Sequence, residues 1–218
     1  MRDLLETELA ASYGSQQMIS VQEDTKSGLF GVNDPKACSD CINRTSYFYR
    51  SCEDKKVSKH KSKKLVKIIC LEDVFQQFRN VPSLTKGGCC DILMYSDDKV
   101  VVMDMTCTRP EYLETHKKDG QEVEGKRDIV YRQIEDSVRK LRGCDVINTK
   151  LDSFTDRVAI FAVRKKIFAV EESETDAAMG MKSYSKMSDD FSSKMGLHTD
   201  MGNGFFFIVQ EYPKVFEW

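Results

Sequence analysis

The middle of the chain alternates between short, strongly apolar runs and segments with helical spacing. Val100 to Val102 are apolar without interruption, which is typical of a strand that is covered on both faces. The polar triplet at 96–98 stands between two apolar runs and predicts a hairpin turn. The strands predicted from these runs are 65–70, 89–95, 99–108 and 157–163.

Other segments repeat apolar side chains every three or four residues, which predicts amphipathic helices. The clearest spans 126–142, and Gly143 follows it as a stop signal. A second spans 72–78, and a short helix is expected over 3–11. The inward-facing positions of the two longer helices are Leu71, Val74, Phe75 and Phe78, and Val130, Ile134, Val138 and Leu141.

The remaining segments are loops and the C-terminal part of the chain. Residues 13–36 are polar with turn signals, and 116–125 is a charged loop. Helical and strand periodicity is lost over 171–203, so we expect an excursion that is flexible or shaped by a protein partner. An apolar strand at 205–209 and an aromatic tail then return to the core. We therefore predict one α/β domain over 1–218, a mixed central β-sheet flanked by helices, with its core at about 65–168 plus 204–218.

Composition excludes few classes of function. No apolar run approaches the roughly 18 residues of a membrane span, and the charged N-terminus does not resemble a signal peptide, so we expect a cytoplasmic protein with no membrane contact. The net charge of −2 gives no general support for binding to nucleic acid. Lysine and arginine nevertheless dominate 50–67, which is either a solvated surface or a patch for nucleic acid or an acidic partner.

The eight cysteines are expected to be reduced thiols in such a compartment. Cys38 and Cys41 have the two-residue spacing of a zinc pair, and Cys52 and His60 could complete a tetrahedron. Because the second half lacks the close pairing of typical zinc motifs, a structural Zn²⁺ site here is one of two interpretations. The other is a set of unrelated side chains.

Two acids stand at corresponding ends of the predicted hairpin. Asp91 opens one arm and Asp104 lies late in the other, and antiparallel pairing brings such positions together. Two carboxylates at one end of a buried sheet are costly unless a cation neutralises them, and hard oxygen ligands suit Mg²⁺. The alternative is that each acid caps a turn or pairs with a lysine or arginine.

The run from Asp91 to Asp104-Met105-Thr106, followed by a helix that carries Gln133, resembles the PD-(D/E)xK superfamily, whose fold is called restriction-endonuclease-like. The resemblance covers about 65–165 and implies that Asp91 and Asp104 bind a divalent metal. It also implies an upstream acid, for which Glu72 is the candidate, and a helical glutamine, for which Gln133 is the candidate.

The chain departs from this pattern at one position that matters for catalysis. Thr106 stands where the superfamily has the lysine that orients or activates the attacking water. Lys126 or Arg132 could supply the positive charge from elsewhere, or the site could be vestigial. The resemblance thus implies Mg²⁺-dependent hydrolysis of nucleic acid, in a setting such as phage defence or mobile-element biology. The alternative is a catalytically inactive interaction or regulatory subunit, with 171–203 as its contact.

Overall fold

The computed structural model describes residues 1–33, 56–78, 80–108, 112–165 and 199–218. It confirms the α/β class: an eight-stranded mixed sheet runs in the order β1-β2-β3-β4-β7-β9-β8, and β10 pairs with β2. The strands of this sheet are β1 (Glu23–Asn33), β2 (Lys56–Cys70), β3 (Ile92–Tyr95), β4 (Lys99–Thr108), β7 (Asp156–Lys165), β8 (Thr199–Asp200), β9 (Phe206–Glu211) and β10 (Val215–Glu217).

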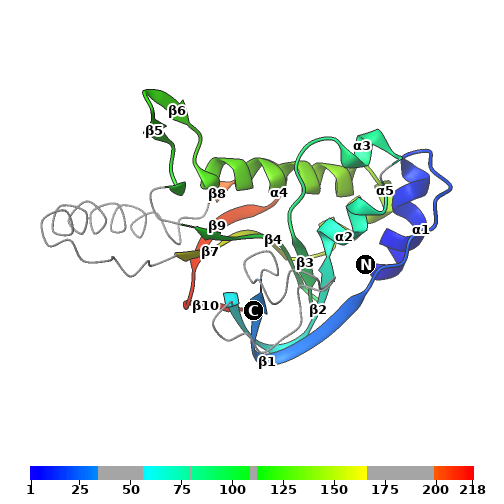
Figure 1. Cartoon of the computed structure of the whole chain (residues 1–218). Helices are drawn as coiled ribbons and strands as arrows, with labels where there is room; N and C mark the ends of the chain where they lie inside the picture. The colour runs from blue at the N-terminus through cyan, green and yellow to red at the C-terminus, as the bar shows by residue number, and fades with distance from the viewer. Residues whose placement is uncertain (34–55, 79, 109–111, 166–198) are drawn as a thin grey trace, which may run out of the picture.

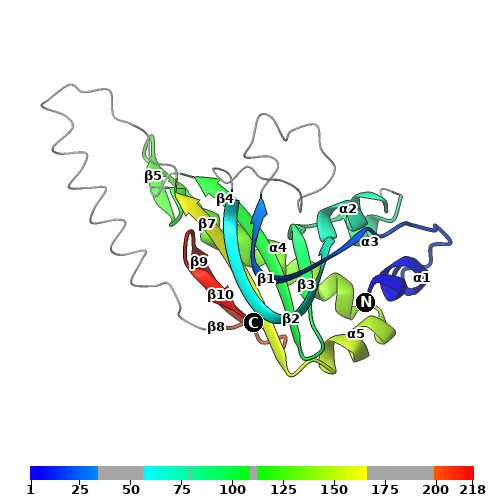
Figure 2. The ribbon, with the colours of Figure 1, turned by 90° about the horizontal axis from the view of Figure 1, so that it is seen from below.

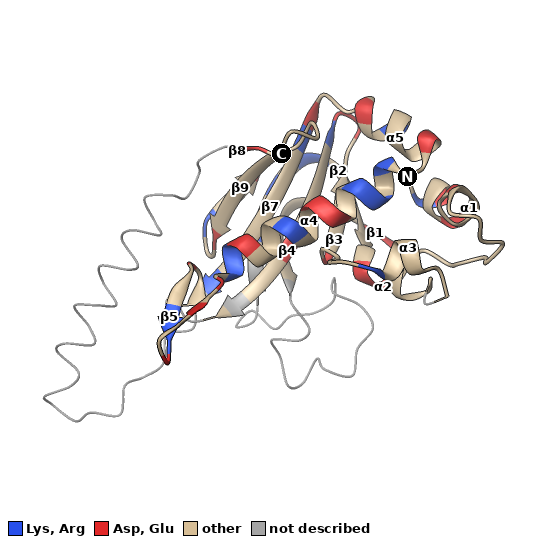
Figure 3. Ribbon diagram, turned by 90° about the horizontal axis from the view of Figure 1, so that it is seen from above, with Lys and Arg blue, Asp and Glu red and all other residues tan. Residues whose placement is uncertain are grey.

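The helices lie together on one face of this sheet (Figure 1). The longest, α4, crosses over β4 and β7 (Figure 3) and turns its apolar stripe inward, as its spacing predicts. The prediction of a helix near 72–78 is confirmed in a shorter form. The bounds are α1 (Arg2–Ser12), α2 (Leu71–Gln76), α3 (Pro82–Thr85), α4 (Lys126–Arg142) and α5 (Asp145–Asp152).

Strand β4 lies at the centre of the sheet, and this position explains the unbroken apolar run in its sequence. It pairs antiparallel with β3 and parallel with β7. Val100 and Val102 pack into the core beneath the helices, whereas Val101 and Met103 pack into a second core on the other face. Both faces are buried, so neither needs polar side chains.

The second face is covered by a bent ribbon of β1 and β2 (Figure 2). Pairing shifts between Lys26 and Gly28, and Gly28 has a φ of 70°, a value that favours glycine. At this irregularity β2 contains two more residues than β1, so the pair of strands bends over the core. Strand β10 pairs with the N-terminal half of β2, at Lys59 to Lys61. The prediction of turns without regular structure over 13–36 is therefore wrong for 23–33.

Two further segments differ from the sequence predictions. The charged loop at 116–125 contains a hairpin of β5 (His116–Lys118) and β6 (Gln121–Val123), whose turn residues Asp119 and Gly120 both have positive φ. Helix α5 was not predicted. Of the excursion at 171–203, only 199–203 is described, and there β8 pairs with β9 and Met201 is buried.

A polar cluster lies inside the second core, and we call Ser58, His60, Gln210 and Trp218 the His60 network. Ser58 donates to Gln210 Oε1 at 2.7 Å and lies 2.7 Å from His60 Nε2, while the Trp218 indole donates to His60 Nδ1 at 3.4 Å. Gln210 Nε2 donates to the carbonyls of Lys59 and Lys214. Strands β2, β9 and the C-terminal end are thus joined through buried hydrogen bonds.

Candidate functional site

A cavity of about 180 Å³ opens beneath α4 beside the ends of β3 and β4, and we call it the acidic cavity. Five of the side chains that the sequence singled out for chemistry line it, although they come from separate elements: Glu72, Asp91, Asp104, Lys126 and Gln133. Its full lining is Glu72, Cys89, Asp91, Asp104, Met105, Thr106, Lys126, Val130 and Gln133.

Strand register brings the two central acids together. Ile92 pairs with Met103, so one further step along the same antiparallel register places Asp91 opposite Asp104. Asp91 Oδ2 accepts a hydrogen bond of 2.8 Å from the backbone N–H of Met105, which fixes its carboxylate against β4. Asp104 is only 6% exposed. The convergence expected from the hairpin is therefore present.

The loop before Asp91 is held by side chains of α4. Asp136 Oδ2 accepts the N–H of Gly88, Ser137 Oγ accepts the N–H of Cys90, and the Lys140 ammonium donates to the Gly88 carbonyl, each at 2.8 Å. A Cβ on Gly88 would come within 2.7 Å of the Gln133 Cα, so only glycine permits this approach. Sequence reasoning missed these positioning residues, and Gly87-Gly88 was the one signal for them.

Glu72 reaches the cavity from the first turn of α2. That turn is attached to the same site, because the backbone N–H groups of Leu71 and Glu72 donate to the Asp91 carbonyl at 2.8 and 3.3 Å. Gln76 Nε2 donates to Glu72 Oε1 at 3.2 Å. The position of the upstream acid is thus coupled to that of Asp91.

The basic side chain of the cavity comes from the start of α4. Lys126 lines the cavity, as does Thr106, the residue that the sequence resemblance matched to a lysine. Arg132, the other candidate, is outside the lining and forms a two-pronged ion pair with Glu124. Of the two replacements considered for the missing lysine, the structure brings only Lys126 to the acids.

The donors available to a cation are oxygen atoms. Burial raises the pKa of the Cys89 thiol to about 12 and raises the pKa of the Cys90 thiol well above its ordinary value, so both remain neutral at physiological pH. Within the described residues, no three His, Cys, Asp or Glu side chains form a group that could hold a metal ion. Mg²⁺ is commonly held by one or two carboxylates with water in its other positions, so the pair of Asp91 and Asp104 fits it chemically.

The proposed zinc ligands cannot be compared with one another, because Cys38, Cys41 and Cys52 lie outside the described residues. The fourth, His60, is fully buried, and both of its ring nitrogens have hydrogen-bond partners in the His60 network. The described cysteines Cys70, Cys89, Cys90 and Cys144 are free thiols.

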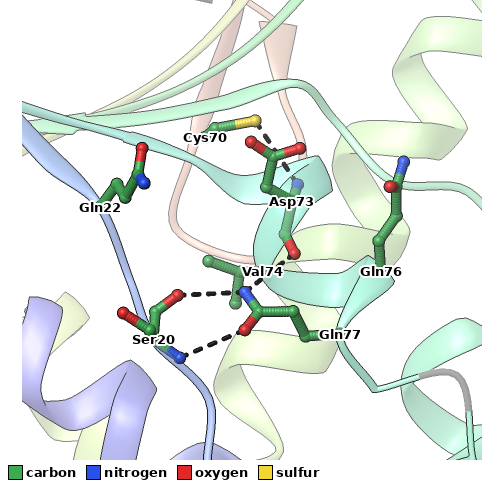
Figure 4. Close-up of a pocket in the computed structure, with 7 residues that line it drawn as sticks. All are labelled: Ser20, Gln22, Cys70, Asp73, Val74, Gln76 and Gln77. Carbon is green, nitrogen blue, oxygen red and sulfur yellow. Dashed lines mark hydrogen bonds between the residues drawn. The ribbon is translucent and has the colours of Figure 1, made fainter. Parts of the chain in front are cut away.

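Two larger cavities are lined in part by α2 or α4, the helices that also contribute to the acidic cavity. The first, of about 510 Å³, lies between α2 and the segment before β1; there the Gln77 amide is bonded to the backbone of Ser20, and Asp73 is the one carboxylate of its lining (Figure 4). The second, of about 500 Å³, we call the cationic cavity; it is lined by Tyr13, Ser83, Lys86, Gly87, Arg139 and Lys140.

Comparison with models of protein families, with curated proteins and with solved structures found no match for this chain. No helix within the described ranges is both long and apolar enough to cross a membrane.

Proposed function

We propose that the acidic cavity binds a divalent cation and that the chain hydrolyses phosphodiester bonds of nucleic acid, as a divergent relative of the PD-(D/E)xK nucleases. The observation that carries this proposal is the meeting of Glu72, Asp91, Asp104, Lys126 and Gln133 in one small cavity. These five residues are spread over positions 72–133 of the sequence. Their meeting in one cavity is therefore a result of the fold and not of their proximity along the chain.

Each side chain has a role consistent with its place. Asp91 and Asp104 would hold the cation, and a bound Mg²⁺ would supply an activated water and stabilise charge on the phosphoryl oxygens. Lys126, which is exposed at its helix start, would donate to a phosphate oxygen as negative charge develops. The Gln133 amide would orient the water, and Glu72 would accept its proton.

A catalytically inactive subunit of the same ancestry is the second candidate, and Thr106 favours it. A neutral hydroxyl in the lysine position cannot stabilise developing negative charge as an ammonium does. Under this alternative the cavity would still bind a cation, while partners would be recognised elsewhere, for example through 171–203.

Thermal melting in Mg²⁺ or Mn²⁺ tests the site directly. A ligand at 100 times its Kd stabilises the native state by about 2.7 kcal/mol, so the wild type should melt at a higher temperature with metal. Asp104→Ala should lose that shift, whereas Asp98→Ala, an exposed change in the turn of the same hairpin, should keep it. Equal shifts in the wild type and Asp104→Ala would exclude the metal site.

Cleavage then separates an active enzyme from an inactive subunit. Labelled single- and double-stranded DNA and RNA would be incubated with Mg²⁺ or Mn²⁺ and the wild type, Lys126→Ala or Asp104→Ala. Activity that both substitutions remove supports hydrolysis at this cavity. Metal binding without cleavage of any substrate supports the inactive subunit.

A further inference from the structure

The acidic cavity poses an electrostatic problem for the substrate proposed above. Its lining has three carboxylates and one lysine, whereas a nucleic-acid strand brings a negative charge with every nucleotide. A bound cation offsets the charge only locally. A strand that binds there would need positive side chains beside the cavity.

The cationic cavity supplies such side chains. Lys86 and Arg139 are exposed, and Lys140 forms part of the same lining although it is only 3% exposed. The Lys140 ammonium donates to the Gly88 carbonyl and lies 5.0 Å from the centre of the Phe75 ring. Asp136 lies beside these groups: its carboxylate forms an ion pair with Arg139 and accepts a hydrogen bond from the Gly88 N–H.

The cationic and acidic cavities are neighbours on opposite sides of one contact. Gly87 lines the first, and Gly88 packs against Gln133, which lines the second. Gln133 and Lys140 are seven residues apart on α4, which is about 10 Å along a helix. Each nucleotide of a strand carries its own phosphate, so neighbouring backbone phosphates of one strand can span a separation of this order, whereas a single phosphate cannot.

We infer that the cationic cavity binds a backbone phosphate of the same strand whose scissile phosphate lies at the acidic cavity. This inference rests on the proposed function and narrows its substrate to a polynucleotide, because a mononucleotide could not occupy both cavities. Ser83 adds a hydroxyl beside the three cations, whereas the Tyr13 hydroxyl donates to the Lys140 carbonyl at 2.8 Å.

The test measures binding in EDTA of a fluorescent 16-nucleotide single-stranded DNA, and of the RNA of the same sequence, between 50 and 200 mM KCl. Lys86→Ala/Arg139→Ala removes two exposed cations and should raise Kd about tenfold. It should also reduce the slope of log Kd against log[KCl] by about 1.4, since each phosphate contact on a single strand contributes about 0.7. Lys86→Arg/Arg139→Lys should restore binding if the charge is what matters.

Lys61→Ala/Lys64→Ala is the matched control, because it removes the same charge from β2, away from α4. An equal loss with the control pair, or no binding by the wild type at 50 mM KCl, would overturn the inference. Selective loss with Lys86→Ala/Arg139→Ala supports it, even if no cleavage is found. Selective loss of binding without any cleavage would support the phosphate-binding site and contradict the hydrolytic function.

Discussion

Polar side chains are buried on both faces of the central sheet, but the two groups differ in their surroundings. In the His60 network every donor has an acceptor inside the protein: the Ser58 hydroxyl donates to Gln210, and its oxygen accepts from His60 Nε2–H. His60 Nδ1 in turn accepts from the Trp218 indole. The acidic cavity instead gathers carboxylates around an open space that a ligand can enter.

This difference predicts that the two regions affect stability and the proposed function separately. The His60 network contains neutral groups from β2, β9 and the C-terminal end, so it joins distant strands without a buried charge. The acidic cavity is lined by three carboxylates and one lysine, a lining that would favour a bound cation. We therefore expect changes in the first region to affect folding and changes in the second to affect ligand binding and activity.

The largest expected effect is on activity, from Asp104→Asn. Removing the charge while keeping the shape should lower cleavage by about 100-fold or more, or about 3 kcal/mol of transition-state stabilisation. The free energy of unfolding without metal should change by less than about 1 kcal/mol, because the amide keeps the shape of the carboxylate and relieves its repulsion with the neighbouring acids. Cleavage rates and urea melts of the same preparation measure both quantities. A large loss of stability would show that Asp104 is structural.

Gln210→Leu should have the reverse signature. It leaves the carbonyls of Lys59 and Lys214 without their buried donor and the Ser58 hydroxyl without its acceptor. Each unsatisfied buried group costs about 1–3 kcal/mol, so unfolding free energy should drop by roughly 3 kcal/mol. The Mn²⁺ affinity of the folded protein should not change. Urea denaturation and Mn²⁺ titration followed by electron paramagnetic resonance report these two outcomes.

Lys140→Met should weaken metal binding through the loop that precedes Asp91. The substitution removes the ammonium donor to the Gly88 carbonyl but keeps the length of the side chain. Changes that disturb the support of metal ligands typically reduce affinity 10- to 100-fold, and we expect the lower end. Tyr13→Phe is the control, because it removes a hydrogen bond to the Lys140 carbonyl and leaves the loop untouched. Equal affinities in both variants would disprove this role.

A further expected effect concerns stability in acid. Burial lowers the pKa of His60 to about 3, while the unfolded chain has an ordinary histidine with a pKa near 6.5. The unfolded state therefore binds a proton that the folded state does not, so stability is full above about pH 6.5 and falls between there and about pH 3. The slope approaches 1.4 kcal/mol per pH unit at its steepest. Unfolding free energies of the wild type and His60→Gln from pH 7 to 4 should differ in slope by about one proton.

The sequence foretold the elements around the site better than those of the bent ribbon. Apolar runs and helical spacing identified β3, β4, β7 and α4 because their inward positions are hydrophobic. In β2 the inward positions include Ser58, His60 and Ser62. Because these polar residues alternate with lysines, the sequence of this half of the strand resembles that of a charged surface segment. Polar residues that satisfy one another in the core leave no hydrophobic pattern to detect.

The sequence by itself indicated which side chains are candidates for chemistry, since acids within a predicted hairpin and polar residues on an amphipathic helix are visible in it. Only the tertiary structure decided that Lys126, and not Arg132, reaches the acids. It also revealed that Asp136, Ser137 and Lys140 hold the loop before Asp91. Those contacts join residues about 50 positions apart. The sequence pattern of one helix or strand predicts only the periodicity of that element. The contacts between α4 and the loop before Asp91 depend instead on how α4 lies across the sheet.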